Sequence, residues 1–305
     1  GSSTLTIQPK TNNTTITFAD DLASGLNLSS TEFGYLRMPT VIIGGSSATG
    51  LITVNAITLN SAVTNLTLQN SGSSNNGGIT IAGALSNLRN LTLTSAGTIR
   101  LNIGAVTTPG VQTYNGAITL GGDTTLTGTI VTTKAALAGA NHELHIVGNA
   151  VFGDTSSDTL TGLTSLDVTG STTINAGTVT SSGIQTYNGA VSLGATSTLT
   201  ASTVTFKGTV GGAYGLTIIG DAVFGDSSTD TVTLSGSGKA LSVSGATAIN
   251  ANISTSGAQT YNGAVSLGTT TTLTGSTVTF KDVVSGAYGL TIAGNAVFGD
   301  DSTDT

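Results

Sequence analysis

The feature that most constrains the fold of this chain is a repeat with two periods. The decapeptide QTYNGAVSLG occurs at residues 185–194 and at 259–268, and a near copy, QTYNGAITLG, occurs at 112–121. A second motif, NAVFGD or DAVFGD, recurs at 149–154, 221–226 and 295–300. The two motifs therefore recur with the same long interval. Such regular self-similarity is typical of a repeat architecture rather than of a single globular core.

A shorter period lies inside the long one. Large apolar residues recur at an interval about one quarter as long, and Val243 and the smaller Thr133 take the place of an aromatic residue in two coils. We interpret this spacing as one coil of a β-solenoid, so that each long repeat contains four coils. One structural column is then expected to contain these aromatic residues: Tyr114, Phe152, Tyr187, Phe206, Phe224, Tyr261, Phe280 and Phe298.

The residues between these positions alternate as they do in strands. Val204 and Phe206 are apolar, whereas Thr203, Thr205 and Lys207 between and beside them are polar. Three such strands with tight Gly, Asn, Asp or Ser corners need about 15–18 residues. The pattern therefore predicts an all-β fold, a three-sided parallel β-helix with about 18–19 residues per coil. A string of β-sandwich domains fits less well, because that fold has a period of about 100 residues.

The two ends of the chain differ in their repetition. Residues 1–110 form a non-repetitive segment that still reads as strands. Residues 111–305 carry long repeats of about 74 residues, which start near 112, 185 and 259. No linker separates the two, so we expect β-helix throughout. One short helical turn is expected after Ser29, because Ser29 and Glu32 have the spacing of a capping box.

Composition excludes several function classes. Only 8% of the residues are charged, the net charge is −7 and there is no run of basic residues, so no nucleic acid partner is expected. The absence of Cys excludes disulfides, and no apolar stretch approaches the length of a membrane span. Nothing in the sequence indicates a cofactor.

The sequence resembles a known family of large bacterial exoproteins. The resemblance rests on the segments STLTIQP, LNLSSTEFGYL and TVIIGGSSATGLITVNAITL near the start, and on GAQTYNGAVSLGTTTTLTGSTVTFKDVV in the third repeat. Together they resemble filamentous-haemagglutinin-like adhesins of the two-partner secretion type over essentially the whole chain. The resemblance implies a right-handed β-helix, export through an outer-membrane secretion partner and an extracellular location on the bacterial cell surface. The family's secretion-signal motifs are not evident, so we expect an internal repeat segment of a longer protein.

Acidic residues after each Phe of the second motif are the candidate metal ligands: Asp154, Asp158, Asp226, Asp230, Asp300, Asp301 and Asp304. Calcium is coordinated by six to eight oxygen atoms, and these turns supply two or three carboxylates each. An Asx turn, in which Asp caps backbone amides, explains the same spacing. We therefore expect structural turns and no metal, with calcium as the alternative.

Two histidines form a second candidate metal site. His142 and His145 lie in NHELH, which is not the H-E-x-x-H pattern of zinc helices. With no Cys and no other His in the chain, a zinc site would lack ligands. Alignment with the later repeats indicates instead a strand corner with one inserted residue.

Lysine positions argue against catalysis. A glycan-active β-helix enzyme needs carboxylates and basic residues concentrated in one cleft. Lys134, Lys207 and Lys281 occupy one position in successive repeats and Lys239 stands alone, as expected for solvent-facing strand residues. We therefore predict no enzymatic activity.

The tyrosines are a candidate carbohydrate platform. Tyr187 and Tyr261 would share a column only every fourth coil, and Tyr214 and Tyr288 in the GAYGL motif are as widely spaced. This spacing is too sparse for a continuous row, so packing in the core or at corners is the favoured interpretation.

These observations predict a structural role. The expected function is a stalk or adhesin segment of a large secreted bacterial surface protein, with a host-cell or surface glycan receptor as a partner class. Low charge and Thr-rich faces allow rods to associate, so a subunit of a self-assembling extracellular filament or sheath is the first alternative. A glycan-active enzyme is the second.

Overall fold

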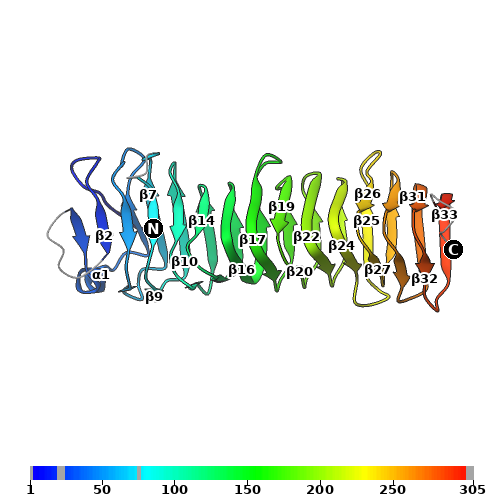
Figure 1. The fold of residues 1–305 in the computed structure, drawn as a ribbon. Coiled ribbons are helices and arrows are strands. Elements are labelled where there is room, and N and C mark those ends of the chain that lie inside the picture. The colour runs from blue at the N-terminus through cyan, green and yellow to red at the C-terminus, as the bar shows by residue number, and fades with distance from the viewer. Residues whose placement is uncertain (1–2, 19–24, 74–76, 300–305) are drawn as a thin grey trace. The chain divides into compact units, whose positions relative to one another are not determined.

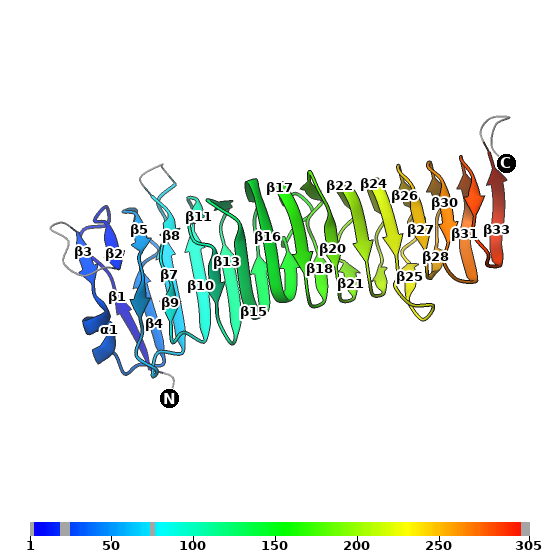
Figure 2. The same cartoon turned by 60° about the horizontal axis from the view of Figure 1, so that its bottom comes forward.

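The computed structural model describes residues 3–18, 25–73 and 77–299 and confirms the predicted all-β parallel β-helix. The chain divides into two compact units, residues 1–149 and residues 150–305. Within each unit, strands about one coil apart in the sequence lie side by side in parallel (Figure 1, Figure 2). Each unit is described below by itself.

The first unit consists of short strands and one helix. Its elements are β1 (Thr4–Ile7), β2 (Ile16–Phe18), β3 (Leu26–Leu28), α1 (Ser30–Tyr35), β4 (Thr40–Gly44), β5 (Ile52–Val54), β6 (Ile57–Thr58), β7 (Asn65–Asn70), β8 (Ile79–Ile81), β9 (Leu85–Ser86), β10 (Asn90–Ser95), β11 (Ile99–Leu101), β12 (Ala105–Thr107), β13 (Val111–Asn115), β14 (Ile118–Leu120) and β15 (Thr124–Thr133). The unit boundary falls within β16 (Leu137–Phe152).

Coil length changes along the first unit. On one face β1, β4, β7, β10, β13 and the end of β15 pair in turn, and each strand contributes one buried or half-buried residue to a stack: Ile7, Ile43, Leu68, Leu93, Tyr114 and Thr133. The numbering of this stack shows that the coil from Ile7 to Ile43 is the longest and that from Tyr114 to Thr133 the shortest. The predicted length of about 18–19 residues per coil is found only at the end of this unit, from Tyr114 to Thr133. The longer and unequal coils explain why no period is visible in residues 1–110.

The helical turn predicted after Ser29 is confirmed as α1. The Glu32 backbone N–H donates to the Ser29 hydroxyl at 3.3 Å, and the Ser29 backbone N–H donates to the Glu32 carboxylate at 2.8 Å, which is a complete capping box. Phe33 on this helix is buried, with its ring centroid 5.1 Å from that of Phe18. The helix therefore covers apolar residues of an early coil.

The second unit begins with the end of β16 and continues through shorter, more uniform coils. Its elements are β17 (Thr159–Val168), β18 (Thr172–Ile174), β19 (Thr178–Ser181), β20 (Gln185–Tyr187), β21 (Val191–Leu193), β22 (Ser197–Phe206), β23 (Val210–Gly212), β24 (Leu216–Phe224), β25 (Thr231–Leu234), β26 (Leu241–Val243), β27 (Thr247–Ile249), β28 (Asn252–Thr255), β29 (Gln259–Tyr261), β30 (Val265–Leu267), β31 (Thr271–Phe280), β32 (Val284–Ser285) and β33 (Leu290–Phe298).

Strand pairing in the second unit divides the expected aromatic column. Tyr187 pairs with Phe206 and Phe206 with Phe224, but Phe224 then pairs with Ile249 rather than continuing to Val243. A separate series on another face runs through Ile218, Val243, Tyr261, Phe280 and Phe298. The prediction of one column is therefore wrong for this unit.

The prediction of four coils per repeat is wrong for the same reason. The coil from Phe224 to Ile249 is longer than the coils on either side of it, because the corner between β24 and β25 and the corner between β25 and β26 both hold additional residues. The step from Tyr187 to Tyr261 therefore covers three coils and two of the three faces of a fourth. The two copies of the decapeptide in this unit consequently begin on different faces of the helix.

Phe152 also lies outside the column that contains Tyr187 and Phe206. It pairs with Ile174, which pairs with Leu193, and this series is on the third face of the unit. The three Phe residues of the FGD motif thus lie on three different faces, although their sequence surroundings are almost identical.

Candidate functional site

The most repeated motif of the chain forms a buried polar network. The Gln185 side-chain amide donates to the backbone carbonyls of Val179 and Thr200 at 3.2 and 2.9 Å, and its oxygen accepts from the Tyr187 hydroxyl at 3.1 Å. Val179 and Thr200 lie on paired strands of successive coils, so one glutamine side chain connects two coils. The same three contacts recur at Gln112 with Tyr114 and at Gln259 with Tyr261.

These six side chains are fully buried. Burial raises the pKa of the Tyr187 phenol, as it does for Tyr114 and Tyr261, so the hydroxyl remains a hydrogen-bond donor even at a pH that would ionise an exposed phenol. A buried ring cannot stack on a ligand at the surface. The carbohydrate platform considered for Tyr187 and Tyr261 is therefore wrong, and packing in the core is confirmed.

The motif that marks this network in the sequence begins four residues before the decapeptide. A buried hydroxyl precedes each glutamine by four positions, at Thr108, Ser181 and Thr255, and donates to the carbonyl of the glycine two positions on. The complete pattern is therefore [ST]-x-G-x-Q-T-Y-N-G. Gln and Tyr are two positions apart in this pattern, so their side chains point to the same inner face of the strand. This spacing is the sequence signal that indicates a buried amide.

The Asn-Gly pair at the end of the motif turns a corner. The Asn188 side chain donates to the Val168 carbonyl of the preceding coil at 2.9 Å. A Cβ at Gly189 would lie 2.6 Å from the backbone of Gly170, so a side chain there would collide with the coil next to it. The corner therefore requires glycine because of the close approach of two backbones.

In the second unit, aromatic rings continue the networks of Tyr187 and Tyr261 along the stack, whereas in the first unit Tyr114 is followed by Thr133. Ring centroids lie 5.3 Å apart for Tyr187 and Phe206 and 5.6 Å apart for Phe206 and Phe224, and the planes are nearly parallel. The series that starts at Tyr261 has the same geometry at 5.4 and 5.2 Å. Each such pair contributes about 0.5–1.5 kcal/mol beyond the burial of its area.

The acidic turns use their carboxylates to hold the backbone. The Asp158 carboxylate accepts from the backbone N–H groups of Asp154 and Thr155 at 3.0 and 2.9 Å. Burial alone would raise the pKa of Asp158, but these hydrogen bonds outweigh it and the pKa lies below its ordinary value of 3.8. Asp230 accepts from Asp226 and Ser227 in the same way.

This geometry matches the predicted Asx-type turn. In residues 3–18, 25–73 and 77–299, no group of three or more His, Asp or Glu side chains is arranged to hold a metal ion. Asp300, Asp301 and Asp304 lie outside the described residues.

The histidines lie on β16 in a corner of unusual backbone conformation. Ala140 and Asn141 both have positive φ, 51° and 64°, which accommodates the extra residue of this repeat. His142 Nδ1 lies 3.5 Å from an Asp123 carboxylate oxygen, which also accepts from the Glu143 backbone N–H at 3.0 Å. His142 therefore has a carboxylate neighbour, and the segment is a strand corner as predicted.

The repeated lysines occupy the predicted strand ends. Lys134, Lys207 and Lys281 follow the stacked residue of the aromatic series, and the backbone N–H of each donates to the carbonyl of the tyrosine one coil earlier at 2.9 to 3.0 Å. The Lys134 and Lys207 side chains are exposed and that of Lys281 is half-buried.

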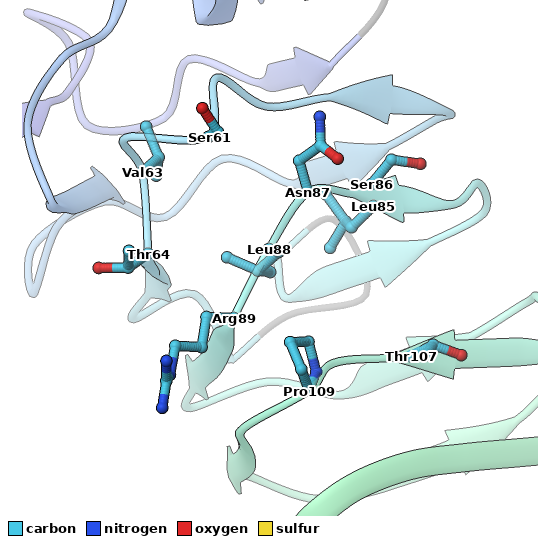
Figure 3. A pocket seen from close by; sticks show the side chains of 10 residues that line it. All are labelled: Ser61, Val63, Thr64, Leu85, Ser86, Asn87, Leu88, Arg89, Thr107 and Pro109. Carbon is cyan, nitrogen blue, oxygen red and sulfur yellow. The ribbon is translucent and has the colours of Figure 1, made fainter.

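A recess of about 600 Å³ lies in the first unit where one ladder is interrupted (Figure 3). β6 and β9 form a two-stranded sheet of their own, whereas β12 pairs onward with β15. Leu88 forms an apolar floor and is 3% exposed. The Arg89 guanidinium lies on the opposite side of the recess from the Asn87 amide (Figure 3).

A second recess, of about 520 Å³, lies in the second unit. We call it the Tyr214 recess and define it by six of its lining residues: Asp154, Asn175, Gly194, Ala195, Tyr214 and Lys239. Unlike Tyr187, Tyr214 is 38% exposed. Asp154, Tyr214 and Lys239 all line it, so a carboxylate residue, an aromatic side chain and an ammonium residue border one recess.

Comparison of the chain with known protein families, curated proteins and solved structures finds no match. No helix in the described part of the chain has both the length and the apolar character needed to cross a membrane.

Proposed function

We propose that this chain is a structural stalk segment of a large secreted bacterial cell-surface protein of the filamentous-haemagglutinin-like type. The observation that supports this proposal most directly is the placement of the repeated motif. Gln185, Tyr187 and their copies connect successive coils inside the core, so the best-preserved residues of the repeat serve cohesion.

Strand pairing supports the same role. In the second unit each coil is hydrogen-bonded to the next on three faces, and each coil contacts only its neighbours. A segment of this kind gains length by adding coils without changing its cross-section, which suits a spacer that displays a distal binding region. Export through an outer-membrane secretion partner and an extracellular location belong to this proposal.

Force spectroscopy of the full chain, held at its two ends, tests the mechanical role. Because coils contact only their neighbours, we expect stepwise extension. A short coil of the second unit would release about 60 Å of chain, and the longer coil from Phe224 to Ile249 about 80 Å. Extension without resistance at the forces that unfold ordinary domains would contradict the proposal.

Immunogold labelling of intact source cells tests the location. Antibody against this chain should label the cell surface without permeabilisation. Label confined to the cell interior would contradict surface display, whatever the mechanical result.

A filament or sheath subunit is the second candidate. Ile184 and Ile219 are 54% and 48% exposed at one corner of the second unit, which favours lateral contact between copies. Electron microscopy of the native material separates the two functions: surface-anchored single molecules support the stalk, and a polymer with a regular subunit repeat supports the filament.

A further inference from the structure

We propose that the Tyr214 recess binds a neutral oligosaccharide. The recess is formed by the corner that follows β18, β21 and β23, together with the Asp154 turn and the segment before β26. Its residues come from successive coils, which are spaced about 4.8 Å apart. An extended chain of sugar rings lying along the stack would therefore contact several coils at once.

The floor of the recess is kept open by small residues. A Cβ at Gly194 would lie 1.9 Å from the Asn175 side-chain oxygen, so this position has no room for a side chain. Ala195 beside it is buried. Asn175 is held in place because its amide donates to the Gly153 carbonyl at 2.9 Å. The volume of about 520 Å³ falls in the range of small-molecule binding sites.

The walls supply an aromatic face and two opposite charges. Tyr214 exposes part of its ring, and the Lys239 ammonium lies 6.0 Å from the ring centroid, which is within the range of a cation–π contact. At the other end the Asp154 turn is fixed by the Asp158 carboxylate, which accepts from its backbone N–H groups. The turn is therefore ordered before any ligand arrives, which lowers the entropic cost of binding.

These groups match a hydroxyl-rich, uncharged ligand. The ring face of Tyr214 suits the apolar face of a sugar ring, a carboxylate accepts hydroxyl protons and an ammonium donates to hydroxyl oxygens. One positive and one negative group leave the lining without net charge, so a polyanion gains little. The ligand class that uses all of these groups is a neutral oligosaccharide.

The arrangement of Asn175, Gly194 and Tyr214 recurs one repeat later, on another corner of the second unit. The Asn250 amide donates to the Gly225 carbonyl at 3.0 Å, and a Cβ at Gly268 would lie 1.9 Å from the Asn250 side-chain oxygen. Tyr288 takes the place of Tyr214 and is 52% exposed. Duplication has therefore preserved the arrangement of glycine, asparagine and exposed tyrosine as a set, although the face differs.

Fluorine NMR of the full chain labelled with 3-fluorotyrosine tests the proposal. The chain has six tyrosines; Tyr114, Tyr187 and Tyr261 are buried, so Tyr35, Tyr214 and Tyr288 are the ones that ligands can reach. The probes are cellohexaose, maltohexaose, laminarihexaose and mannohexaose, with hexagalacturonate as the acidic comparison. Single Tyr→Phe variants assign the resonances.

We expect at least one neutral hexaose to shift the Tyr214 resonance saturably and to leave that of Tyr35 unchanged. In a chain that carries Tyr288→Ala, so that the second copy of the arrangement does not contribute, Tyr214→Ala should weaken binding, measured by titration calorimetry, about tenfold, and Tyr35→Ala should not change it. Far-UV circular dichroism establishes that both variants fold.

Three results would overturn the proposal. One is no shift of Tyr214 with any neutral hexaose at about 10 mM, a concentration that fills most of a site with a dissociation constant of about 1 mM. Another is binding that Tyr214→Ala leaves intact in the chain that also carries Tyr288→Ala. The third is a clear preference for hexagalacturonate, which would assign the recess to acidic ligands instead.

Discussion

Replacement of Gln185 by leucine would test whether the buried Gln–Tyr network holds neighbouring coils together. Gln185→Leu keeps a side chain of similar size but removes the amide that donates to Val179 and Thr200 and accepts from Tyr187. All of these contacts lie where water has no access, since Gln185 and Tyr187 are completely buried. Solvent therefore cannot replace the lost hydrogen bonds.

The magnitude follows from the three contacts. The Tyr187 hydroxyl loses its partner, and leaving a buried polar group unsatisfied costs about 1–3 kcal/mol. Two carbonyl bonds are lost as well, at about 0.5–1.5 kcal/mol each. We therefore expect Gln185→Leu to lower the free energy of unfolding by about 2–6 kcal/mol. Tyr187→Phe removes the same hydroxyl contact from the other side, so the double variant should cost about 1–2 kcal/mol less than the sum of the single changes.

Urea unfolding followed by far-UV circular dichroism measures these differences. Because a solenoid can unfold in parts, hydrogen exchange of the peptides that contain β20 and β22 should accompany it. Thr186→Ala is the matched control, since Thr186 lies on the same strand and points away from the core. The reasoning is refuted if Gln185→Leu is no more destabilising than Thr186→Ala, or if the two network variants are simply additive.

Three further predictions follow from single contacts. Gly189→Ala should destabilise the second unit by about 1–3 kcal/mol in urea, because its Cβ would meet Gly170, whereas Gly211→Ala, which meets nothing within 4 Å, should be close to neutral. Asp158→Asn should lower the melting temperature at neutral pH, and the difference should shrink as the pH falls below about 4, because a carboxyl with a lowered pKa stabilises the fold above its unfolded pKa and loses this effect as the pH falls through its folded value. Thr133→Val should raise the urea midpoint by the equivalent of about 1 kcal/mol, because the Thr133 hydroxyl is buried with no hydrogen-bond partner and valine has the same shape; an unchanged or lower midpoint would show that the hydroxyl is satisfied.

Local rules predicted much of this fold. The alternation of Val204 and Phe206 with polar neighbours identified the inward face, and both residues are fully buried. The spacing of Ser29 and Glu32 identified the start of α1, and both reciprocal bonds are present. These predictions succeeded because parity in a strand and capping at a helix terminus depend on residues close together in the chain.

The stacking of distant residues was not predictable in this way. The partner of Phe224 is Ile249 and not Val243, because the intervening coil places more residues in its corners than its neighbours do. A local sequence pattern does not show whether a residue lies in a corner or in a paired strand. The number of residues in a coil therefore becomes known only when the strands of successive coils are seen to pair. The same uncertainty hid the long coils of the first unit, such as those from Ile43 to Leu68 and from Leu68 to Leu93.

For the candidate sites too, the sequence left alternatives open that only the structure resolved. The carboxylate spacing of Asp154 and Asp158 suits either a metal or an Asx turn, and the observed bonds from backbone N–H groups distinguish the two. Tyr187 and Tyr214 are both preceded by polar or small residues, yet one is fully buried and the other is 38% exposed. Only the corner geometry assigns the first to the core and the second to a recess.

The amino-acid sequence by itself therefore determined that this chain forms parallel strands in stacked coils, since period and parity are local and repeated. The tertiary structure decided which residues stack on one another, because register depends on how many residues each corner holds. It also decided that the glutamine and tyrosine of the repeated decapeptide connect coils inside the core, since a side chain can satisfy backbone carbonyls of two coils only after those coils have been brought to about 4.8 Å from each other.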